Sequence, residues 1–281
     1  MKIVFKKTLL IFAKLFIGIL FKFSAGRFLI DKIINVVLSK KKEVSHNGIN
    51  LTFHTPNRIN FYRIKTFSTK EPETLQWMDG FQKGKIFWDI GANIGLYSCY
   101  AAKKTGCKVY SFEPSVFNLE LLARNIHLNS LLDKITIVPF PLSDITAFKN
   151  FFMTTKEWGG AFSNFGESLD HHGKPISNKF YYKTLGISID QTVNQMNFEK
   201  PNYIKIDVDG IEHLILKGSL NTLKNVESIL IEVNENYKKQ SNEIKKHLVS
   251  SGFRLKEKKQ IEVIEKSINL PYFYNQIWVR Q

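Results

Sequence analysis

From residue 85 onward, short apolar runs alternate with longer helix-like segments, and this rhythm constrains the fold more than any other feature of the chain. The strand-like stretches are residues 86–90, 108–112, 134–140, 203–208, 228–233, 253–260 and 276–280. The helix-like stretches are residues 95–104, 115–129, 190–197, 211–223 and 241–251. This alternation predicts an α/β fold, with a mostly parallel sheet covered by helices on both faces. Ligands of such sheets bind beyond the carboxyl ends of the strands, so the residues there are the first to inspect.

Two regions depart from this rhythm and divide the chain. Residues 145–185 interrupt the alternation and predict an insertion of short strands or loops inside a domain that spans residues 85–281. Residues 43–84 precede this domain, and Asn47-Gly48 predicts a hairpin turn within them. Only two cysteines occur, which excludes a disulfide-stapled scaffold and a Cys-rich zinc module.

Residues 1–42 form a basic and apolar extension, predicted to be helical. They contain ten of the 40 lysines and arginines but one acid, and so supply nine of the formal net charge of +15. The run from Leu9 to Phe23 is almost wholly apolar, but Lys14 and Lys22 interrupt it, whereas a membrane span needs about 20 mostly apolar residues. The pattern instead predicts a helix lying in a membrane interface, with its lysines reaching toward anionic headgroups.

Two other interpretations of this extension remain open. It could be a signal peptide or signal anchor, although Phe23-Ser24-Ala25 is a poor cleavage site. It could also pack on the protein's own core or on a partner subunit. We expect a cytoplasmic protein, peripheral on the cytoplasmic face of the membrane, that meets an anionic membrane surface through residues 1–42.

A Gly-rich turn follows the first strand of the domain, in Asp89-Ile90-Gly91-Ala92-Asn93-Ile94-Gly95. Gly91 permits a tight turn, Ala92 leaves room for a ligand against the backbone, and Gly95 lets the next helix pack close to the sheet. The spacing differs from the three-glycine dinucleotide fingerprint, and the carboxylate of Asp89 suits a cationic ligand group better than a phosphate.

Acidic residues also follow the next three strands of the pattern. Glu113 lies about 20 residues beyond the Gly-rich turn, where an acid can accept two hydrogen bonds from a ribose diol. Ser143-Asp144 follows the third strand, and Asp144 could reach an adenine amino group. The segment Asp207-Val208-Asp209-Gly210-Ile211-Glu212 places three carboxylates at the end of the fourth strand. Singly, each acid could simply cap the following helix, but their ordered recurrence favours one binding site.

With these residues in place, the sequence resembles the FkbM-type methyltransferases, a branch of the S-adenosylmethionine-dependent Rossmann-like enzymes. The resemblance covers about residues 85–235, and its matching stretches are 88–98, 112–114, 142–144, 204–212, 217–218 and 231–233. The usual Asp-Val-Glu-Gly of the family is Asp-Val-Asp-Gly at residues 207–210, which keeps the charge.

The resemblance implies a class I methyltransferase fold, a seven-stranded sheet whose last strand is antiparallel. It also implies S-adenosylmethionine as cofactor and methyl transfer to an oxygen, commonly a hydroxyl of a sugar on a glycan, glycolipid or other natural product. By position, Asp89 and the Gly91–Gly95 turn would hold the methionine part of the cofactor, Glu113 the ribose, and Ser143 and Asp144 the adenine side.

Methyl transfer to a neutral hydroxyl calls for alignment of the acceptor and for a positioned base. Asp207 is the leading candidate for this base, with Asp209 and Glu212 as further catalytic candidates. Asp207 could alternatively bind the cofactor's ammonium group. No metal is assigned, although Asp209, Glu212 and Glu232 could position the substrate or a divalent cation. The histidines His171, His172 and His213 are weaker candidates for the base.

Three other functions remain as alternatives. The net positive charge is compatible with a nucleic-acid (RNA) methyltransferase, but most of this excess lies outside the domain, so no nucleic-acid partner is expected. A non-catalytic membrane-bound adaptor with a degenerate cofactor fold is disfavoured by the intact acidic and glycine positions. A nicotinamide-dependent oxidoreductase is disfavoured because the three-glycine fingerprint is missing.

Overall fold

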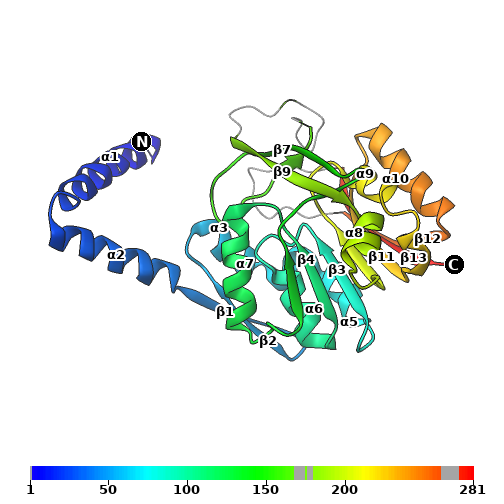
Figure 1. Ribbon diagram of the computed structural model, residues 1–281. Helices are drawn as coiled ribbons and strands as arrows, with labels where there is room; N and C mark the ends of the chain where they lie inside the picture. Colours follow the sequence, from blue (N-terminus) through cyan, green and yellow to red (C-terminus); the bar gives the residue numbers. More distant parts are fainter. Residues whose placement is uncertain (1, 168–174, 176–179, 261–271) are drawn as a thin grey trace.

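The computed structural model describes residues 2–167, 175, 180–260 and 272–281. Its main sheet has seven strands in the order β12-β13-β11-β10-β3-β4-β5 (Figure 1). Their bounds are β3 Ile86–Ile90, β4 Lys108–Phe112, β5 Ile135–Val138, β10 Tyr203–Ile206, β11 Ser228–Asn234, β12 Phe253–Gln260 and β13 Phe273–Arg280. Strands β5, β4, β3, β10 and β11 run parallel, whereas β13 is antiparallel to both β11 and β12. The predicted α/β sheet, with its antiparallel last strand, is therefore confirmed.

The strand order reverses between β3 and β10, which places the ends of these two strands side by side at the centre of the sheet. Asp89 is in register with Lys205, and Ile90 with Ile206. Crevices for ligands form at such reversal points, because the connections leave β3 and β10 in opposite directions. The Gly-rich turn and the acidic segment that begins at Asp207 both start at this point.

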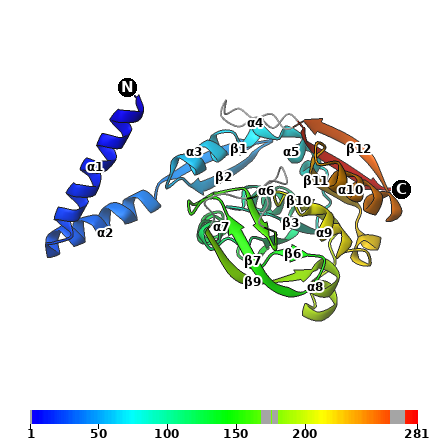
Figure 2. The ribbon, with the colours of Figure 1, turned by 90° about the horizontal axis from the view of Figure 1, so that it is seen from above.

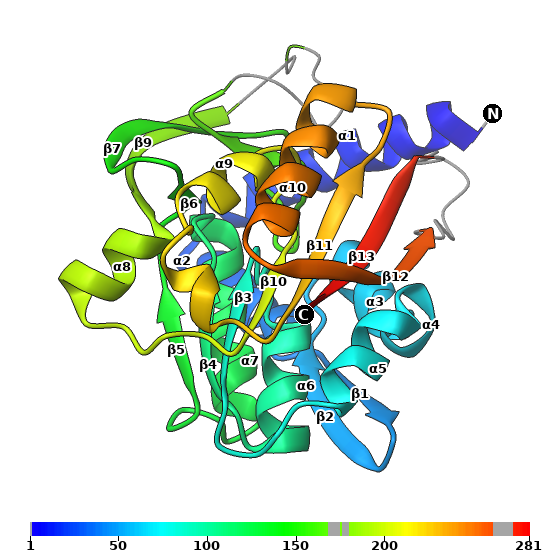
Figure 3. The same ribbon diagram turned by 90° about the vertical axis from the view of Figure 1, so that its right-hand side faces the viewer.

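Helices cover both faces of the sheet (Figure 3). One face packs against α5 (Pro72–Asp79), α6 (Leu96–Thr105) and α7 (Val116–Leu128), and the other against α8 (Ile189–Met196), α9 (Glu212–Lys217) and α10 (Lys238–Ser250). Because side chains alternate along a strand, Phe87 faces the first layer and Trp88 the second. Asp89 is two residues after Phe87 and therefore lies on the same face of the sheet. The polar groups at the end of β3 thus lie on the α5–α6 side.

Residues 41–79 pack against this same face. The hairpin of β1 (Lys41–His46) and β2 (Ile49–His54) turns at Asn47-Gly48, as predicted. The side chains of Asn125 on α7 and of Asn129 directly after it accept hydrogen bonds from the backbone of β2, at His54 and Thr52, both at 2.9 Å. Helices α3 (Arg58–Lys65) and α4 (Phe67–Lys70) then lead to α5, and this path carries them across the end of the sheet where the candidate site lies.

The region between β5 and β10 forms a second, smaller sheet rather than extending the main one. Its strands are β6 (Leu142–Ser143), β7 (Ala147–Met153), β8 (Ser163–Phe165) and β9 (Phe180–Ser188), in the order β6-β9-β7-β8. Figure 1 shows β7 and β9 lying above the β3–β4 part of the main sheet. The interruption predicted over residues 145–185 is thus built of short strands, and His171 and His172 lie outside the described residues.

Helices α1 (Lys2–Leu20) and α2 (Ser24–Leu38) form an arm that extends away from the body of the protein (Figure 2). The arm exposes large apolar side chains along its length, including Phe12 at 65 % and Phe16 at 62 % exposure. The interpretation that this segment packs on the protein's own core is therefore wrong, because the arm contacts little of that core. Among the residues described, no helix has the length and low charge that crossing a membrane requires.

Candidate active site

The turn after β3 lies directly against the end of β10, and Gly91 makes this approach achievable. Gly91 has φ of +88°, and a Cβ atom at this position would lie 1.9 Å from the backbone oxygen of Asp207. The turn is fixed on its other side by the backbone N–H groups of Gly91 and Ala92, which both donate to the carbonyl of Phe112 at 3.0 Å. The two segments that the sequence singled out therefore meet here.

Gly95, at φ +83°, precedes α6 and has a different neighbour from the one expected. A Cβ atom there would lie 2.5 Å from Cδ1 of Leu122 on α7. The expectation that Gly95 brings its helix close to the sheet is thus corrected, because the close approach joins α6 to α7. In the same turn, the Asn93 side chain donates to the carbonyl of Gly160 at 2.8 Å and so holds the insertion over the turn.

Glu113 lies at the end of β4 and supports the Gly-rich turn. Its two carboxylate oxygens accept hydrogen bonds from the backbone N–H groups of Asn93 and Ser115, at 2.8 and 2.7 Å. Burial raises the pKa of Glu113 to about 7, against the lowering effect of these hydrogen bonds. The side chain is therefore held rigidly beside the turn, and each oxygen keeps further capacity to accept a hydrogen bond.

Asp89 is buried beneath the turn. One carboxylate oxygen accepts a hydrogen bond from the Ser98 hydroxyl at 2.5 Å, and Ser98 accepts one from Ser111 at 2.7 Å. The other oxygen, Oδ1, is buried without a hydrogen-bond partner. Burial raises the pKa of Asp89, while the neighbouring Lys205 ammonium opposes this rise. The carboxylate contributes negative potential below the turn, but it does not line the cavities around it.

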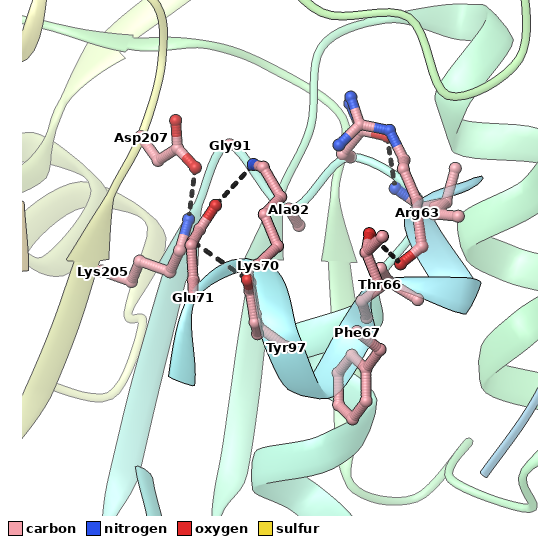
Figure 4. A pocket seen from close by; sticks show the side chains of 13 residues that line it. Arg63, Thr66, Phe67, Lys70, Glu71, Gly91, Ala92, Tyr97, Lys205 and Asp207 are labelled. Atoms are coloured by element: carbon pink, nitrogen blue, oxygen red, sulfur yellow. Dashed lines mark hydrogen bonds and ion pairs between the residues drawn. The ribbon is translucent and has the colours of Figure 1, made fainter. Parts of the chain in front are cut away.

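A network of partly buried ion pairs lies beside the turn, as Figure 4 shows. Lys205 on β10 is 2 % exposed at its side chain and donates to Oδ2 of Asp207 at 2.8 Å. Lys70 lies 2.5 Å from Oε1 of Glu71, whose other oxygen accepts a hydrogen bond from the Tyr97 hydroxyl at 2.9 Å. Burial alone would raise the pKa of Glu71, but Lys70, Lys205 and these hydrogen bonds lower it to about 2.

Asp207 also belongs to a cluster of three carboxylates. Oxygens of Asp207, Asp209 and Glu232 lie within 4.8 Å of one another. Asp209, at φ +62°, accepts hydrogen bonds from the backbone N–H groups of Phe162 and Ser163 in the insertion, at 2.7 and 3.3 Å. Burial and then Asp207 raise the pKa of Asp209 to about 6, and burial and the neighbouring carboxylates raise that of Glu232 well above its ordinary value.

Glu212, which the sequence grouped with these acids, has a different position. It is buried and accepts hydrogen bonds from the backbone N–H of Gly210 at 3.1 Å and from the Gln240 side chain at 2.9 Å. It fixes the turn that carries Asp209 and does not line the cavities described below. Ser143 and Asp144 also lie outside these linings, and Asp144 pairs with the exposed Lys217 at 2.9 Å.

Three adjoining cavities surround Gly91. The first is lined by Arg63, Thr66, Phe67, Lys70, Glu71, Gly91, Ala92, Asn93, Ile94, Leu96, Tyr97, Lys205 and Asp207. The second is mostly apolar and is lined by Ile90, Gly91, Phe112, Pro114, Phe140, Pro141, Leu142, Phe151, Ser163, Phe165, Val208 and Ile211. The third is larger and is lined by Ile59, Tyr62, Arg63, Lys70, Gly91, Asn93, Thr154, Thr155, Gly159, Gly160, Ala161, Phe162, Asp207, Asp209, Glu232 and Phe273. We call them the turn cavity, the apolar cavity and the large cavity.

Residues 58–71 and β10 itself also contribute to the site, although they were not predicted from the sequence. Arg63, Lys70, Glu71, Tyr97 and Lys205 line the turn cavity, but none was selected from the sequence. A usable signal existed for Lys205, because a lysine inside the apolar strand Tyr203-Ile204-Lys205-Ile206 must be buried and therefore paired. No local pattern marks Arg63, Lys70 or Glu71, since their contacts are made with residues far along the chain.

A strand-order reversal, a Gly-rich turn and carboxylates at successive strand ends are typical of a Rossmann-like methyltransferase. The model of the "Methyltransferase FkbM domain" matches residues 89–255, and the chain belongs to this family of enzymes. The match sets aside the oxidoreductase and the non-catalytic adaptor as alternatives.

Individual relatives are more distant. "Hexuronic acid methyltransferase AglP" of Haloferax volcanii is 26 % identical over 68 % of this chain and 72 % of its own length. "Methyltransferase sdnD" of Sordaria araneosa is 25 % identical over 58 % of this chain and 73 % of its own. The crystal structure of methyltransferase FkbM from Methylobacillus flagellatus superposes with a TM-score of 0.48 at 14 % identity, covering 78 % of this chain and 53 % of that one.

Proposed function

We propose that this enzyme transfers a methyl group from S-adenosylmethionine to a hydroxyl of a sugar, on a glycan, glycolipid or related natural product. The observation that carries the proposal is the meeting of the three cavities at Gly91. An apolar cavity, a turn rich in ion pairs and a larger cavity of mixed polar and apolar lining adjoin at one point. This arrangement suits a cofactor with an aromatic base, an amino-acid end and a reacting centre toward the acceptor.

The chemistry of the lining residues fits this cofactor. Phe112, Phe140 and Ile211 give the apolar cavity surfaces against which an adenine ring would pack. Glu113 is fixed beside the turn with acceptor capacity left for a ribose diol. The carboxylates of Asp89, Asp207 and Asp209 give this end of the sheet the negative potential that a cationic ligand requires. The placement of Ser143 and Asp144 at the adenine side stays a prediction.

S-adenosylmethionine, when bound, supplies a methyl group already activated by its sulfonium. The protein's task is therefore to orient the acceptor oxygen and to take up its proton. Asp207 lines both the turn cavity and the large cavity, and Lys205 holds its Oδ2 in place, which leaves Oδ1 for the acceptor proton. Asp209 and Glu232 lie next to it, and proximity of like charges favours proton uptake by the cluster.

A sugar acceptor is supported by two observations. The large cavity is lined by polar groups together with Tyr62, Phe162 and Phe273, a combination suited to the mixed polar and apolar surfaces of a sugar ring. The similarity to a protein named as a hexuronic acid methyltransferase points in the same direction.

Calorimetry tests the cofactor, and labelled methyl transfer tests the acceptor. We expect S-adenosylhomocysteine to bind in the micromolar range and to bind more weakly to Glu113→Ala. Glu257→Ala, on the exposed part of β12, is the matched control and should bind normally. Methyl label from S-adenosylmethionine should enter glycans of a cell-extract fraction, and Asp207→Asn should block this transfer while preserving binding. Binding of NAD(H) alone, or label entering RNA instead of glycan, would contradict the proposal.

We further propose that the α1–α2 arm holds the enzyme peripherally on the cytoplasmic face of a membrane. The exposed phenylalanines and leucines of α1 offer an apolar surface, and Lys7 and Lys14 add positive charge to the same helix. Anionic lipid is the partner that complements both properties. This location would bring the enzyme to lipid-linked sugar acceptors.

A further inference from the structure

Three cations line the turn cavity, and two of them are neutralised by neighbours. Lys70 is paired with Glu71 at 2.5 Å, and Lys205 with Asp207 at 2.8 Å. Arg63 also lines this cavity and the large cavity. Within the described part of the chain, Arg63 takes part in no ion pair.

Arg63 is nevertheless held in position. Its Nε donates to the carbonyl of Gly159 at 2.9 Å, which ties α3 to the insertion loop above the turn. That loop is fixed in turn by the amide groups of Asn57, Asn60 and Asn93, which donate to the carbonyls of Trp158 and Gly160. With Nε engaged, the two terminal nitrogens of the guanidinium keep their donors for a ligand.

The charges in the turn cavity are separated in space. Figure 4 shows Arg63 on one side of Gly91 and Ala92, and the Lys205–Asp207 pair on the other. A ligand group lying against the turn would thus meet an unpaired guanidinium at one end and a carboxylate at the other. This arrangement is complementary to a zwitterion, such as the amino-acid end of a molecule.

We propose that Arg63 binds the carboxylate of the cofactor's methionine end; this assignment rests on the proposed function. A guanidinium whose plane is fixed through Nε can still present two parallel donors to a carboxylate. Arg63 lies outside residues 89–255, the segment that matches the family model. Helix α3 and the residues that follow it, up to Glu71, therefore complete a cofactor site whose remaining residues lie within that segment.

Two ligands that differ only at this end provide the test. S-adenosylhomocysteine carries the amino-acid end, whereas 5′-methylthioadenosine lacks it, and calorimetry on the full chain measures both. We expect Arg63→Ala to weaken binding of S-adenosylhomocysteine about tenfold or more and to leave 5′-methylthioadenosine unchanged. Arg63→Lys should recover part of the loss. Lys65→Ala, an exposed cation on the same helix, is the matched control and should bind both ligands normally.

Other outcomes would overturn the assignment. Equal weakening of both ligands by Arg63→Ala would mean that Arg63 supports the site as a whole, and no weakening would mean that the carboxylate lies elsewhere. A uronic-acid acceptor is the other source of a carboxylate. If Arg63→Ala instead abolishes binding of D-glucuronate to the protein saturated with S-adenosylhomocysteine, the guanidinium belongs to the acceptor. Failure of wild type to bind either nucleoside would overturn the proposed function itself.

Discussion

The ammonium group of Lys205 lies 2.8 Å from the carboxylate of Asp207, two residues farther along the chain, and the lysine side chain is only 2 % exposed. Burial alone would lower the pKa of this lysine, but Asp207, Asp89 and Glu71 together raise it. Lys205 therefore compensates part of the negative charge at the end of the sheet, where the carboxylates of Asp207, Asp89 and Glu71 gather.

Replacing this lysine should destabilise the protein strongly. We expect Lys205→Met to lower the free energy of unfolding by about 3–5 kcal/mol, the usual effect of removing one partner of a buried pair. Lys217→Met is the control, because Lys217 also lies 2.9 Å from a carboxylate, that of Asp144, but is 58 % exposed. That variant should lose much less stability, because exposed ion pairs contribute little. Urea unfolding measures both, and similar losses would show that burial of Lys205 has no energetic consequence.

The close contact between Gly91 and Asp207 predicts that alanine is much more destabilising at position 91 than at another glycine of similar backbone conformation. Gly91→Ala would place a Cβ atom 1.9 Å from the Asp207 backbone oxygen, so strand β10 and the turn would have to separate. Gly106 is a matched control, since its φ of +72° is also left-handed but a Cβ atom there would lie 3.8 Å from Cγ of Lys83, in ordinary contact. We expect Gly106→Ala to cost about 1 kcal/mol and Gly91→Ala several times more, with loss of S-adenosylhomocysteine binding. Equal losses of stability in the two variants would mean that Gly91 and the backbone of Asp207 do not lie this close in solution.

Asp209 makes stability depend on pH in a defined window. Burial first, and the neighbouring Asp207 second, raise its pKa from 3.8 to about 6 in the folded protein. Since the folded state holds this proton more tightly than the unfolded state, its contribution to stability is present below pH 4 and is lost as the pH rises through 6. Asp209→Asn keeps an oxygen for the N–H groups of Phe162 and Ser163 but cannot ionise.

The variant should therefore gain stability relative to wild type as the pH rises from 4 to 7. The gain should reach up to about 3 kcal/mol, since one pKa unit corresponds to about 1.4 kcal/mol. Urea unfolding of both proteins without ligand, at several pH values, measures the difference and cancels the contributions of groups common to both. If the unfolding free energy of the variant minus that of the wild type stays constant or falls over this range, the raised pKa is contradicted.

The elements of the main sheet could be predicted because their signals are local. The strand over residues 86–90 and the strand over residues 108–112 were predicted with the bounds that the structure gives to β3 and β4. The Gly-rich turn was recognisable because the glycine at position 91 serves a backbone requirement that only a residue without a Cβ atom meets. The helix predicted over 211–223 instead ends at Lys217, where Gly218 closes it and a short 3-10 turn follows at Thr222–Asn225.

The rest of the site could not be predicted because it depends on contacts between distant segments. Glu71 meets Tyr97, and Arg63 meets Gly159, and neither pair has a sequence spacing that identifies it. Glu212, by contrast, was selected from the sequence but does not line the cavities. An acid in a turn after a strand can serve chemistry or hold the backbone, and the backbone N–H of Gly210, which donates to it, is visible only in three dimensions.

The exposed surface of α1 predicts that membrane binding depends on single apolar side chains. Phe12 and Phe16 are one helical turn apart and are 65 % and 62 % exposed. We expect Phe12→Ser with Phe16→Ser to weaken binding to vesicles containing phosphatidylglycerol about tenfold or more. In the wild type, both rings would move from water into the membrane interface, and this transfer is lost in the variant. Flotation of the full chain with vesicles measures this binding. Binding should also fall at high salt and on neutral phosphatidylcholine, since the lysines contribute an electrostatic part.

The control is an exposed phenylalanine outside the arm. Phe148 on β7 is 74 % exposed, so Phe148→Ser removes a comparable apolar surface from the body of the protein. This variant should float with the vesicles as wild type does, as should a protein whose only change is Glu120→Ala on α7. A chain that begins near residue 43 should remain with the soluble fraction. If the double variant or this shorter chain floats as efficiently as wild type, the arm is not the membrane contact, and a protein partner for its apolar surface becomes the better explanation.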